Sequence, residues 1–176
     1  QGIHLFSHLV CPVKSIDSTG NVLEGDLKPT SETPMHTRCY QLRSDINAVV
    51  HCHSPYATAY AQTGKTITNN CSTEFLLFFG EDPCLKYGTP GTLDIIADLE
   101  KYINDYDVYL LANHGILALG KTPMEAYSKI MSIEMILKTD FIRRTLFPDE
   151  NCDLPEDEVR RLYESGKKNR GYHIES

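Results

Sequence analysis

The stretch AVVHCHSPYA, residues 48–57, places two histidines at the end of a short apolar run and a proline soon after them. Residues two apart on a β-strand point to the same face, so His51 and His53 can both reach one ion, whereas Cys52 points to the opposite face. Pro55 stands where a helix can begin without losing a needed N–H group. The stretch therefore predicts a strand that carries two imidazoles on one face and leads into a helix.

A second apolar stretch carries a third histidine. The sequence VYLLANHGILALG, residues 108–120, predicts two strands on either side of Asn113-His114-Gly115, so His114 should lie at a strand end. Ligands at strand ends are held on a rigid scaffold. From these two stretches alone, two readings stay open: the histidines share one site, or each is an ordinary surface or core residue.

Glu32, in the stretch PTSE at residues 29–32, completes a possible ligand set with His51, His53 and His114. Neutral imidazoles bind Zn²⁺ at about 2.0–2.1 Å, and a carboxylate can hold or vacate the remaining position when a substrate arrives. Such a set is typical of a reacting metal rather than a structural one. We therefore predict one metal ion at these four residues, Zn²⁺ in the first place and another divalent transition metal as the alternative.

Composition limits the class of protein. The chain has 176 residues and a formal net charge of −7, which predicts one domain over residues 1–176 and argues against binding to nucleic acid or to an anionic membrane. No apolar run approaches the roughly 18 residues of a membrane span, and no signal peptide is visible. The six cysteines include no C-x-x-C pair, which favours reduced thiols and a cytoplasmic location.

The remaining segments alternate between helices and strands without a regular βαβ rhythm. Strands are expected at residues 9–13, 21–23, 48–53, 108–112 and directly after residue 115, with a turn at residues 17–20. Helices are expected at residues 29–42, 55–62, 92–103 and 123–144 and from about residue 155, while the segment 71–80 is ambiguous between helix and strand. The predicted fold class is α/β, a three-layer α/β/α arrangement in which helices flank a central, mostly antiparallel sheet.

Some of these helices carry more specific expectations. Thr30 or Ser31 can cap the helix that follows them. His36 lies one turn after Glu32 and can share its face of the helix. The helix at residues 92–103 should place four apolar side chains in the core: Leu93, Ile96, Leu99 and Ile103.

Several ordered motifs together resemble a known family. The order PTSE (29–32), AVVHxHSPYA (48–57), YGTPGT (87–92) and LLxNHGIxAxGKTPxEA (110–126) is similar to the class II aldolase/adducin family, most closely to its zinc aldolases of the L-fuculose-phosphate aldolase type. The similarity covers nearly the whole chain, which lacks roughly forty N-terminal residues of the family pattern. The resemblance implies a class II aldolase-like fold and a homotetramer whose active sites lie between neighbouring subunits.

The resemblance also implies roles for individual residues. Glu32, His51, His53 and His114 match the family's zinc site, and the glutamate also serves as the catalytic acid/base. Three further residues match positions that contact the substrate's phosphate group: Gly2, Thr30 and Ser31. A phosphate near Thr30 and Ser31 is physically reasonable, because the free N–H groups and partial positive charge of a helix start favour an anion. Capping of the helix alone is the alternative explanation for either hydroxyl.

The chain also departs from the family pattern. The segment Asn70-Cys71-Ser72-Thr73 stands where the family's aldolases place a catalytic tyrosine. A second family tyrosine, in the C-terminal tail, falls near Arg170, with Tyr172 close by. We therefore expect a neighbouring subunit to complete the site, with the tail at residues 170–173 lying near that subunit's metal.

The expected function is that of a zinc-dependent aldehyde-lyase. It would perform retro-aldol cleavage of a ketose phosphate to dihydroxyacetone phosphate and an aldehyde, with the metal as a Lewis acid. One alternative is a sugar-phosphate 4-epimerase of the L-ribulose-phosphate type, which breaks the same bond and rebuilds it. The sequence Ser-Pro-Tyr-Ala after His53 favours the aldolase. Another alternative is a non-catalytic binding module like adducin, which lacks the metal ligands.

Overall fold

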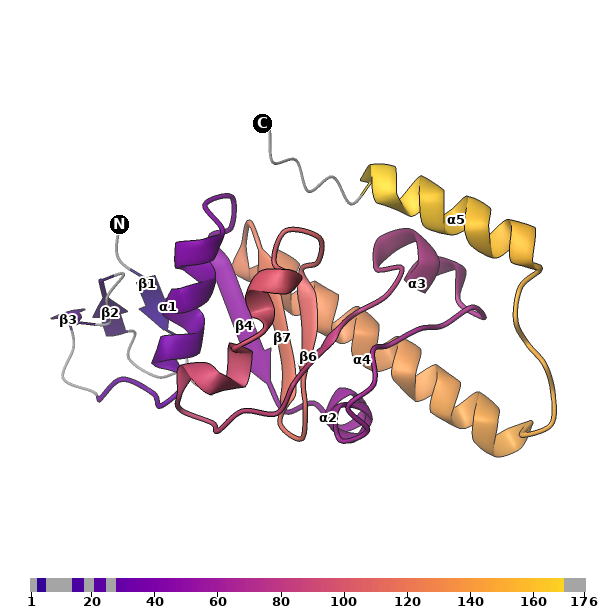
Figure 1. Ribbon diagram of the computed structural model, residues 1–176, viewed down its shortest axis with the longest axis horizontal. Helices are drawn as coiled ribbons and strands as arrows, with labels where there is room; N and C mark the ends of the chain where they lie inside the picture. Colours follow the sequence, from indigo (N-terminus) through magenta and orange to yellow (C-terminus); the bar gives the residue numbers. More distant parts are fainter. Residues whose placement is uncertain (1–2, 6–13, 18–20, 25–27, 170–176) are drawn as a thin grey trace.

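The computed structural model describes residues 3–5, 14–17, 21–24 and 28–169 (Figure 1). Its central sheet has the spatial order β4-β7-β6-β5, made by β4 (Ala48–Cys52), β5 (Cys84–Leu85), β6 (Val108–Leu111) and β7 (Gly115–Gly120). β4 pairs with β7 and β7 with β6 in antiparallel fashion, whereas β5 and β6 are parallel. The prediction of a mostly antiparallel sheet is confirmed.

Alternating residues of these strands face two separate hydrophobic cores. On β6, Tyr109 and Leu111 belong to one core, and Val108 and Leu110 belong to the other. The period of two along a strand explains this division. A sheet that is apolar on both faces must be covered on both faces, so the pattern requires a layer of helices on each side.

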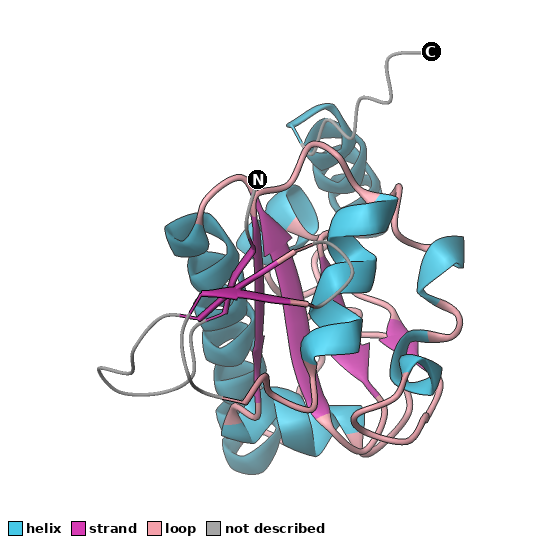
Figure 2. Ribbon diagram, turned by 90° about the vertical axis from the view of Figure 1, so that its left-hand side faces the viewer, coloured by secondary structure: helices cyan, strands magenta, loops and turns pink. Residues whose placement is uncertain are grey.

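Two layers of helices cover the sheet, as the view along one edge shows (Figure 2). One face packs against α1 (Thr33–Leu42) and against two 3₁₀-helices, η1 (Leu93–Ile96) and η2 (Leu99–Lys101). The other face packs against α2 (Pro55–Ala61) and the long helix α4 (Pro123–Leu146). The three-layer α/β/α prediction is therefore confirmed. Within the described ranges, no helix is both long and apolar enough to cross a membrane.

The ambiguous segment 71–80 forms a short helix, α3 (Thr73–Phe78), because the Ser72 hydroxyl accepts a hydrogen bond from Phe75 N and caps it. The last helix, α5 (Glu156–Asn169), packs on α3 beyond the edge of the sheet (Figure 1). A Cβ atom on Gly166 would lie 2.5 Å from the carbonyl oxygen of Leu77, so only glycine permits this close packing.

A second, smaller antiparallel sheet contains β1 (Ile3–Leu5), β2 (Lys14–Ile16) and β3 (Val22–Glu24). β2 and β3 flank the predicted turn, and the Asp17 carboxylate accepts hydrogen bonds from the backbone and side chain of Asn21. The predicted strand at residues 21–23 thus corresponds to β3. The predicted strand at residues 9–13 lies outside the described residues.

The prediction of one continuous helix at residues 92–103 is wrong. Asp98 interrupts the helix with backbone angles φ −105° and ψ 10°, and its carboxylate accepts a hydrogen bond from Lys86 N next to β5. The two halves are short 3₁₀-helices, in which the side chains that face the core differ from those of an α-helix. Leu93 is therefore 52% exposed, and Ile95 takes the core position at 2%.

Candidate metal centre

His51 and His53 come from the end of β4 and the residue just beyond it. Their Nε2 atoms lie 3.1 Å apart, and their rings meet edge to face with centroids 4.9 Å apart. The intervening Cys52 packs with the core on the α2 and α4 side of the sheet. The prediction that the two imidazoles share a face and that Cys52 points away is confirmed.

His114 reaches the same point from the turn between β6 and β7. Asn113 has a positive φ of 59°, a backbone conformation that asparagine tolerates better than most residues. His114 N then donates to Leu111 O at 2.9 Å, which tightens the turn. The Nε2 atom of His114 lies 3.3 Å from that of His53, and its ring stacks on that of His51 at 4.9 Å with an interplanar angle of 8°.

Glu32 lies at the start of α1 and faces the histidines. Its Oε2 atom lies 3.9 Å from Nε2 of His114, and this oxygen is buried without a hydrogen-bond partner among the described residues. Glu32 already has helical backbone angles, φ −82° and ψ −1°, and its side chain makes no capping bond. The hydroxyl of Thr30 accepts a hydrogen bond from Glu32 N, so the prediction of a cap is confirmed for Thr30. The carboxylate is instead available to the histidine cluster.

The protonation of His51 is set by its surroundings. Its Nδ1 lies 2.9 Å from the carbonyl oxygen of Ile116, to which a neutral ring donates its Nδ1–H, leaving the Nε2 lone pair directed at the cluster. Burial lowers the pKa of His51 to about 4, and burial followed by the neighbouring His53 lowers that of His114, against the effect of Glu32. Both rings are therefore neutral at pH 7, which is the form that binds a metal.

The three imidazoles lie close enough together to share one metal ion. Bonds of about 2.0–2.1 Å in a tetrahedral arrangement place ligand atoms about 3.3 Å apart, and Nε2 of His53 lies 3.1 Å from that of His51 and 3.3 Å from that of His114. The ligand atoms of His51, His53 and His114 all lie within 4.8 Å of one another. The Glu32 oxygen without a hydrogen-bond partner is a carboxylate oxygen, which is a suitable fourth ligand in its chemistry. The three imidazoles thus make a group that can hold a metal, with the carboxylate beside it.

Gly115 lets the strands that carry the histidines approach one another. A Cβ atom at this position would lie 2.5 Å from Cys52 O, 2.8 Å from Cδ2 of His53 and 3.2 Å from Cε1 of His51. Neither Gly115 nor Asn113 was predicted to matter from the sequence. The signal that could have identified them is the combination Asn-His-Gly between two apolar runs, in which asparagine and glycine are the residues suited to a tight turn.

His36 contacts the sheet and is not one of the three clustered histidines, although its charge contributes to the lowered pKa of His51. Burial lowers the pKa of His36 to about 4, and a hydrogen bond to the backbone of Val49 opposes this shift. Tyr40, one turn further along α1, also hydrogen-bonds to the backbone of Val49. His36 therefore helps to attach α1 to β4, two residues before the ligand His51.

Thr30 and Ser31 directly precede Glu32 in the sequence, and both are exposed. The Thr30 hydroxyl accepts a hydrogen bond from Glu32 N at 3.3 Å. A Cβ atom added to Gly91 would lie 3.4 Å from the Cβ atom of Ser31, so these two residues are in contact. The loop at residues 87–92 thus contacts the residue before Glu32. Gly2, Arg170 and Tyr172, which the sequence analysis singled out, lie outside the described residues.

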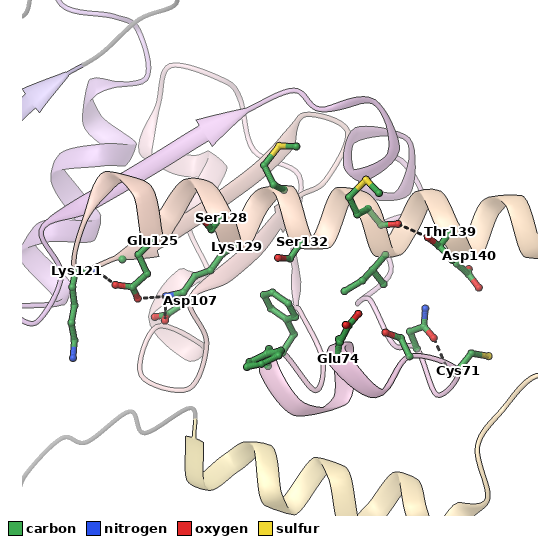
Figure 3. Close-up of a pocket in the computed structure, with 18 of the residues that line it drawn as sticks. Cys71, Glu74, Asp107, Lys121, Glu125, Ser128, Lys129, Ser132, Thr139 and Asp140 are labelled. Atoms are coloured by element: carbon green, nitrogen blue, oxygen red, sulfur yellow. Dashed lines mark hydrogen bonds and ion pairs between the residues drawn. The ribbon is translucent and has the colours of Figure 1, made fainter.

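A groove of about 1190 Å³ lies elsewhere, along α4 (Figure 3). Met131 and Met135 line it, and one of its four cationic residues, Lys129, is engaged, with Nζ 2.6 Å from Asp107 and 2.8 Å from Glu125. Neither the histidines nor Glu32 line this groove. The groove is therefore separate from the histidine cluster.

Comparison with known proteins identifies the family of the chain. Residues 12–141 match the family model described as the class II aldolase and adducin N-terminal domain. An L-fuculose phosphate aldolase from Methanococcus maripaludis strain C5 is 36% identical over 130 residues, which are 74% of this chain and 69% of the relative. A 5-deoxy-D-ribulose 1-phosphate aldolase from Bacillus thuringiensis serovar kurstaki is 35% identical over 155 residues, 87% of this chain and 69% of the relative.

Solved structures show the same relationship. An L-fuculose 1-phosphate aldolase superposes with a TM-score of 0.75 and 30% identity, over 88% of this chain and 72% of its own. YgbL of Klebsiella pneumoniae, described as a candidate aldolase, epimerase or decarboxylase, superposes with a TM-score of 0.72 and 29% identity, over 85% and 72%. The chain therefore belongs to the class II aldolase and adducin family, and its relatives place it with that family's aldolases, which are metal-dependent carbon–carbon lyases.

Proposed function

We propose that this protein is a zinc-dependent aldehyde-lyase that cleaves a ketose phosphate into dihydroxyacetone phosphate and an aldehyde. The observation that carries the proposal is the convergence of three imidazole nitrogens beside a buried carboxylate oxygen that has no hydrogen-bond partner in the described structure. Zn²⁺ is the metal we favour, because it suits imidazole ligands with one carboxylate and is redox-inert. Another divalent transition metal remains the alternative.

His51, His53 and His114 would hold the metal through their Nε2 atoms. His51 is oriented for this by the bond between its Nδ1 and Ile116 O, which fixes the tautomer. When bound, the metal supplies a Lewis acid that withdraws electron density from the substrate's carbonyl group. Burial keeps the imidazoles of His51 and His114 neutral, so protons compete little for their nitrogens near pH 7.

Glu32 would be the catalytic acid/base. Its Oε2 atom can accept the proton of the C4 hydroxyl while the C3–C4 bond breaks and the C4–O bond becomes the carbonyl of the aldehyde. The electron pair of the broken bond stays with the three-carbon fragment, and a proton delivered to C3 completes dihydroxyacetone phosphate. The proton lost by the hydroxyl is balanced by the proton gained at carbon, so no oxidant is needed.

Thr30, Ser31 and Gly2 would bind the phosphate group. The two hydroxyls directly precede Glu32 and the start of α1, where backbone N–H groups favour an anion. Both relatives named above act on sugar phosphates according to their names. A phosphate held here would bring the adjacent carbons of the substrate toward the carboxylate and the histidines.

We further propose that the protein is a cytoplasmic homotetramer with sites shared between subunits. Several large apolar side chains of α4 are exposed in the single chain: Met124, Tyr127, Met131, Met135, Phe141, Ile142 and Leu146. A surface of this kind favours association. The five described cysteines are free thiols, which suits a reducing compartment.

A panel of ketose phosphates incubated with the metal-loaded protein tests the proposal. Coupled reduction of dihydroxyacetone phosphate should detect cleavage of at least one of them. The 4-epimerase alternative, which the similarity to YgbL keeps relevant, would instead yield the C4 epimer without free dihydroxyacetone phosphate. A protein that binds no stoichiometric metal and turns over no sugar phosphate would fit the adducin-like alternative and contradict both enzymatic readings.

A further inference from the structure

Glu134, on α4, makes two hydrogen bonds to the start of a different helix. Its Oε1 accepts from Tyr56 N at 2.9 Å and its Oε2 accepts from Ala57 N at 2.9 Å. These N–H groups belong to the first turn of α2, where no carbonyl of the helix can reach them. A half-buried carboxylate therefore joins two elements that are 77 and 78 residues apart in the sequence.

Glu134 caps the start of α2, which the side chain of the residue before α2 does not do. Ser54 occupies the N-cap position, but its side chain makes no capping bond, and its hydroxyl oxygen is buried without a hydrogen-bond partner among the described residues. A carboxylate at a helix start is stabilised by the N–H groups and by the positive end of the helix dipole. The orientation of α2 thus depends on a side chain that α4 supplies.

The segment fixed in this way leads directly back to a proposed metal ligand. His53 lies between Cys52, the last residue of β4, and Ser54, the N-cap residue of α2. On one side its backbone is held by the pairing of Cys52 with Ile116. On the other side it is held by α2, which rests on α4 through buried Ala57 and through the aromatic pair Tyr56 and Phe141.

His53 needs this support more than His51 does. His51 lies within β4, and its Nδ1 bonds to Ile116 O. Within the described part of the chain, the His53 ring makes polar contacts only with His51 and His114. The direction of the His53 ring is therefore set by the backbone on either side of it. On the α2 side, this backbone is held by the hydrogen bonds to Glu134.

We propose that Glu134 is a positioning residue that holds His53 in place for metal binding through the N-terminus of α2. The inference rests on the proposed metal centre and adds to it a residue 81 positions further along the chain than His53. Loss of an outer partner that orients a metal ligand lowers metal affinity by about 10–100-fold. The same range is expected when Glu134 is replaced by alanine.

Zinc affinity of the metal-free protein, measured by competition with a chromophoric chelator, tests the proposal. Glu134→Ala should bind zinc at least about 10-fold more weakly than wild type. Glu134→Gln keeps the length and one carbonyl oxygen acceptor, so it should recover part of the affinity. If the alanine variant does not fold, the glutamine variant and its far-UV circular dichroism supply the comparison. Equal loss in both variants would indicate an effect of charge alone and overturn the proposal.

Glu125→Ala is the matched control. Glu125 is also an α4 carboxylate that accepts a backbone hydrogen bond, from Lys121 N at 3.0 Å, but no proposed ligand follows that segment. This variant should keep wild-type zinc affinity. If it loses as much affinity as Glu134→Ala, the effect is general destabilisation and the positioning role is wrong.

A double variant separates positioning from fold stability. If Glu134 acts through His53, then adding Glu134→Ala to His53→Ala should weaken zinc binding no further than His53→Ala alone. Additive losses would overturn the proposal. Wild-type affinity in Glu134→Ala together with weak binding in His53→Ala would also overturn it while leaving the metal centre intact. Wild-type affinity in His53→Ala and His51→Ala would contradict the metal centre itself.

Discussion

A Cβ atom on Gly115 would lie 2.8 Å from Cδ2 of His53, closer than carbon atoms of packed side chains approach one another. The same Cβ atom would lie 2.5 Å from the carbonyl oxygen of Cys52. That carbonyl belongs to β4, which pairs with β7 through Cys52 and Ile116, so it cannot move without disturbing the strand. The position of the His53 imidazole therefore requires a glycine at residue 115.

We expect Gly115→Ala to lose metal binding. The added methyl group must displace either the His53 ring or the end of β4, and both changes separate the Nε2 atoms. Zinc affinity should fall by at least about 10-fold, as for other losses of ligand orientation. Gly120→Ala is the control, because its Cβ atom would lie 2.8 Å from Ala126 N at the other end of β7. Similar zinc affinity in the two variants would contradict the expectation.

His51→Ala and His114→Ala should both lose stoichiometric zinc and activity together. Each removes one of three nitrogens that lie within 4.8 Å of one another, and the remaining pair leaves the ion with too few protein ligands. Metal analysis of the purified variants after dialysis measures the loss. His36→Gln provides a histidine control outside the cluster and should retain metal. Wild-type zinc content in both cluster variants would remove the basis of the proposed site.

Much of the centre could be predicted from sequence because its ligands follow short-range rules. The period of two along β4 determines that His51 and His53 share a face, and the apolar runs around Asn113 and Gly115 determine the two strands of a hairpin. These patterns depend on neighbours in the chain. The α4 helix was predicted for the same reason, since its start and its apolar periodicity are local signals.

Other features depend on partners that are distant in sequence. The break at Asp98 depends on a hydrogen bond from Lys86 N, which lies beside β5. Because β5 is only two residues long, neither this strand nor the break produces a periodic pattern in the sequence. The role of Glu134 requires knowledge that α4 passes the start of α2. A single glutamate on a helix surface carries no sequence signal for such a contact. Tertiary packing decides these cases.

Stability of the metal-free protein should fall as pH is lowered from 7 to 4.5, and His36 should account for part of the loss. Its pKa is about 4 in the folded protein against 6.5 ordinarily. Between these values the unfolded state binds more protons than the folded state. The contribution of His36 to the free energy of unfolding is therefore complete above pH 6.5 and is lost as the pH falls toward 4. The contribution of His36 over this interval is about 2 kcal/mol.

Urea unfolding of wild type and His36→Gln, with a chelator present, measures this effect. The difference in the free energy of unfolding between pH 7 and pH 4.5 should be smaller in the variant by that amount. Burial also lowers the pKa of His51 and of His114, so the variant should keep a residual pH dependence of the same sign. An identical pH dependence in the two proteins would show that His36 is not neutralised by folding.

The proposed assembly predicts a particle of about 80 kDa, four times the 19.9 kDa chain, in light scattering at micromolar concentration. Deletion from Lys168 onward should impair turnover while zinc stays bound, because the expected tyrosine position of the tail falls near Arg170. Mixed tetramers of the tail-deleted protein with full-length His51→Ala should regain activity at sites that combine an intact metal centre with a partner's tail. A monomer with full activity would contradict both the assembly and the shared site.

Glu32→Gln should separate catalysis from metal binding. Three imidazoles remain to hold zinc, and the glutamine side chain has nearly the size of the glutamate, so zinc content should change little. The variant cannot take up the proton of the substrate hydroxyl, and turnover should fall by about 10²–10⁴-fold, the usual contribution of a positioned acid/base. Glu150→Gln, at an exposed loop position, should behave as wild type. Oε2 of Glu32 lies 3.9 Å from Nε2 of His114, so the carboxylate is close enough to approach a metal held by that histidine. Near-normal turnover in Glu32→Gln would mean that another group moves the proton, whereas loss of zinc together with turnover would reduce Glu32 to a ligand.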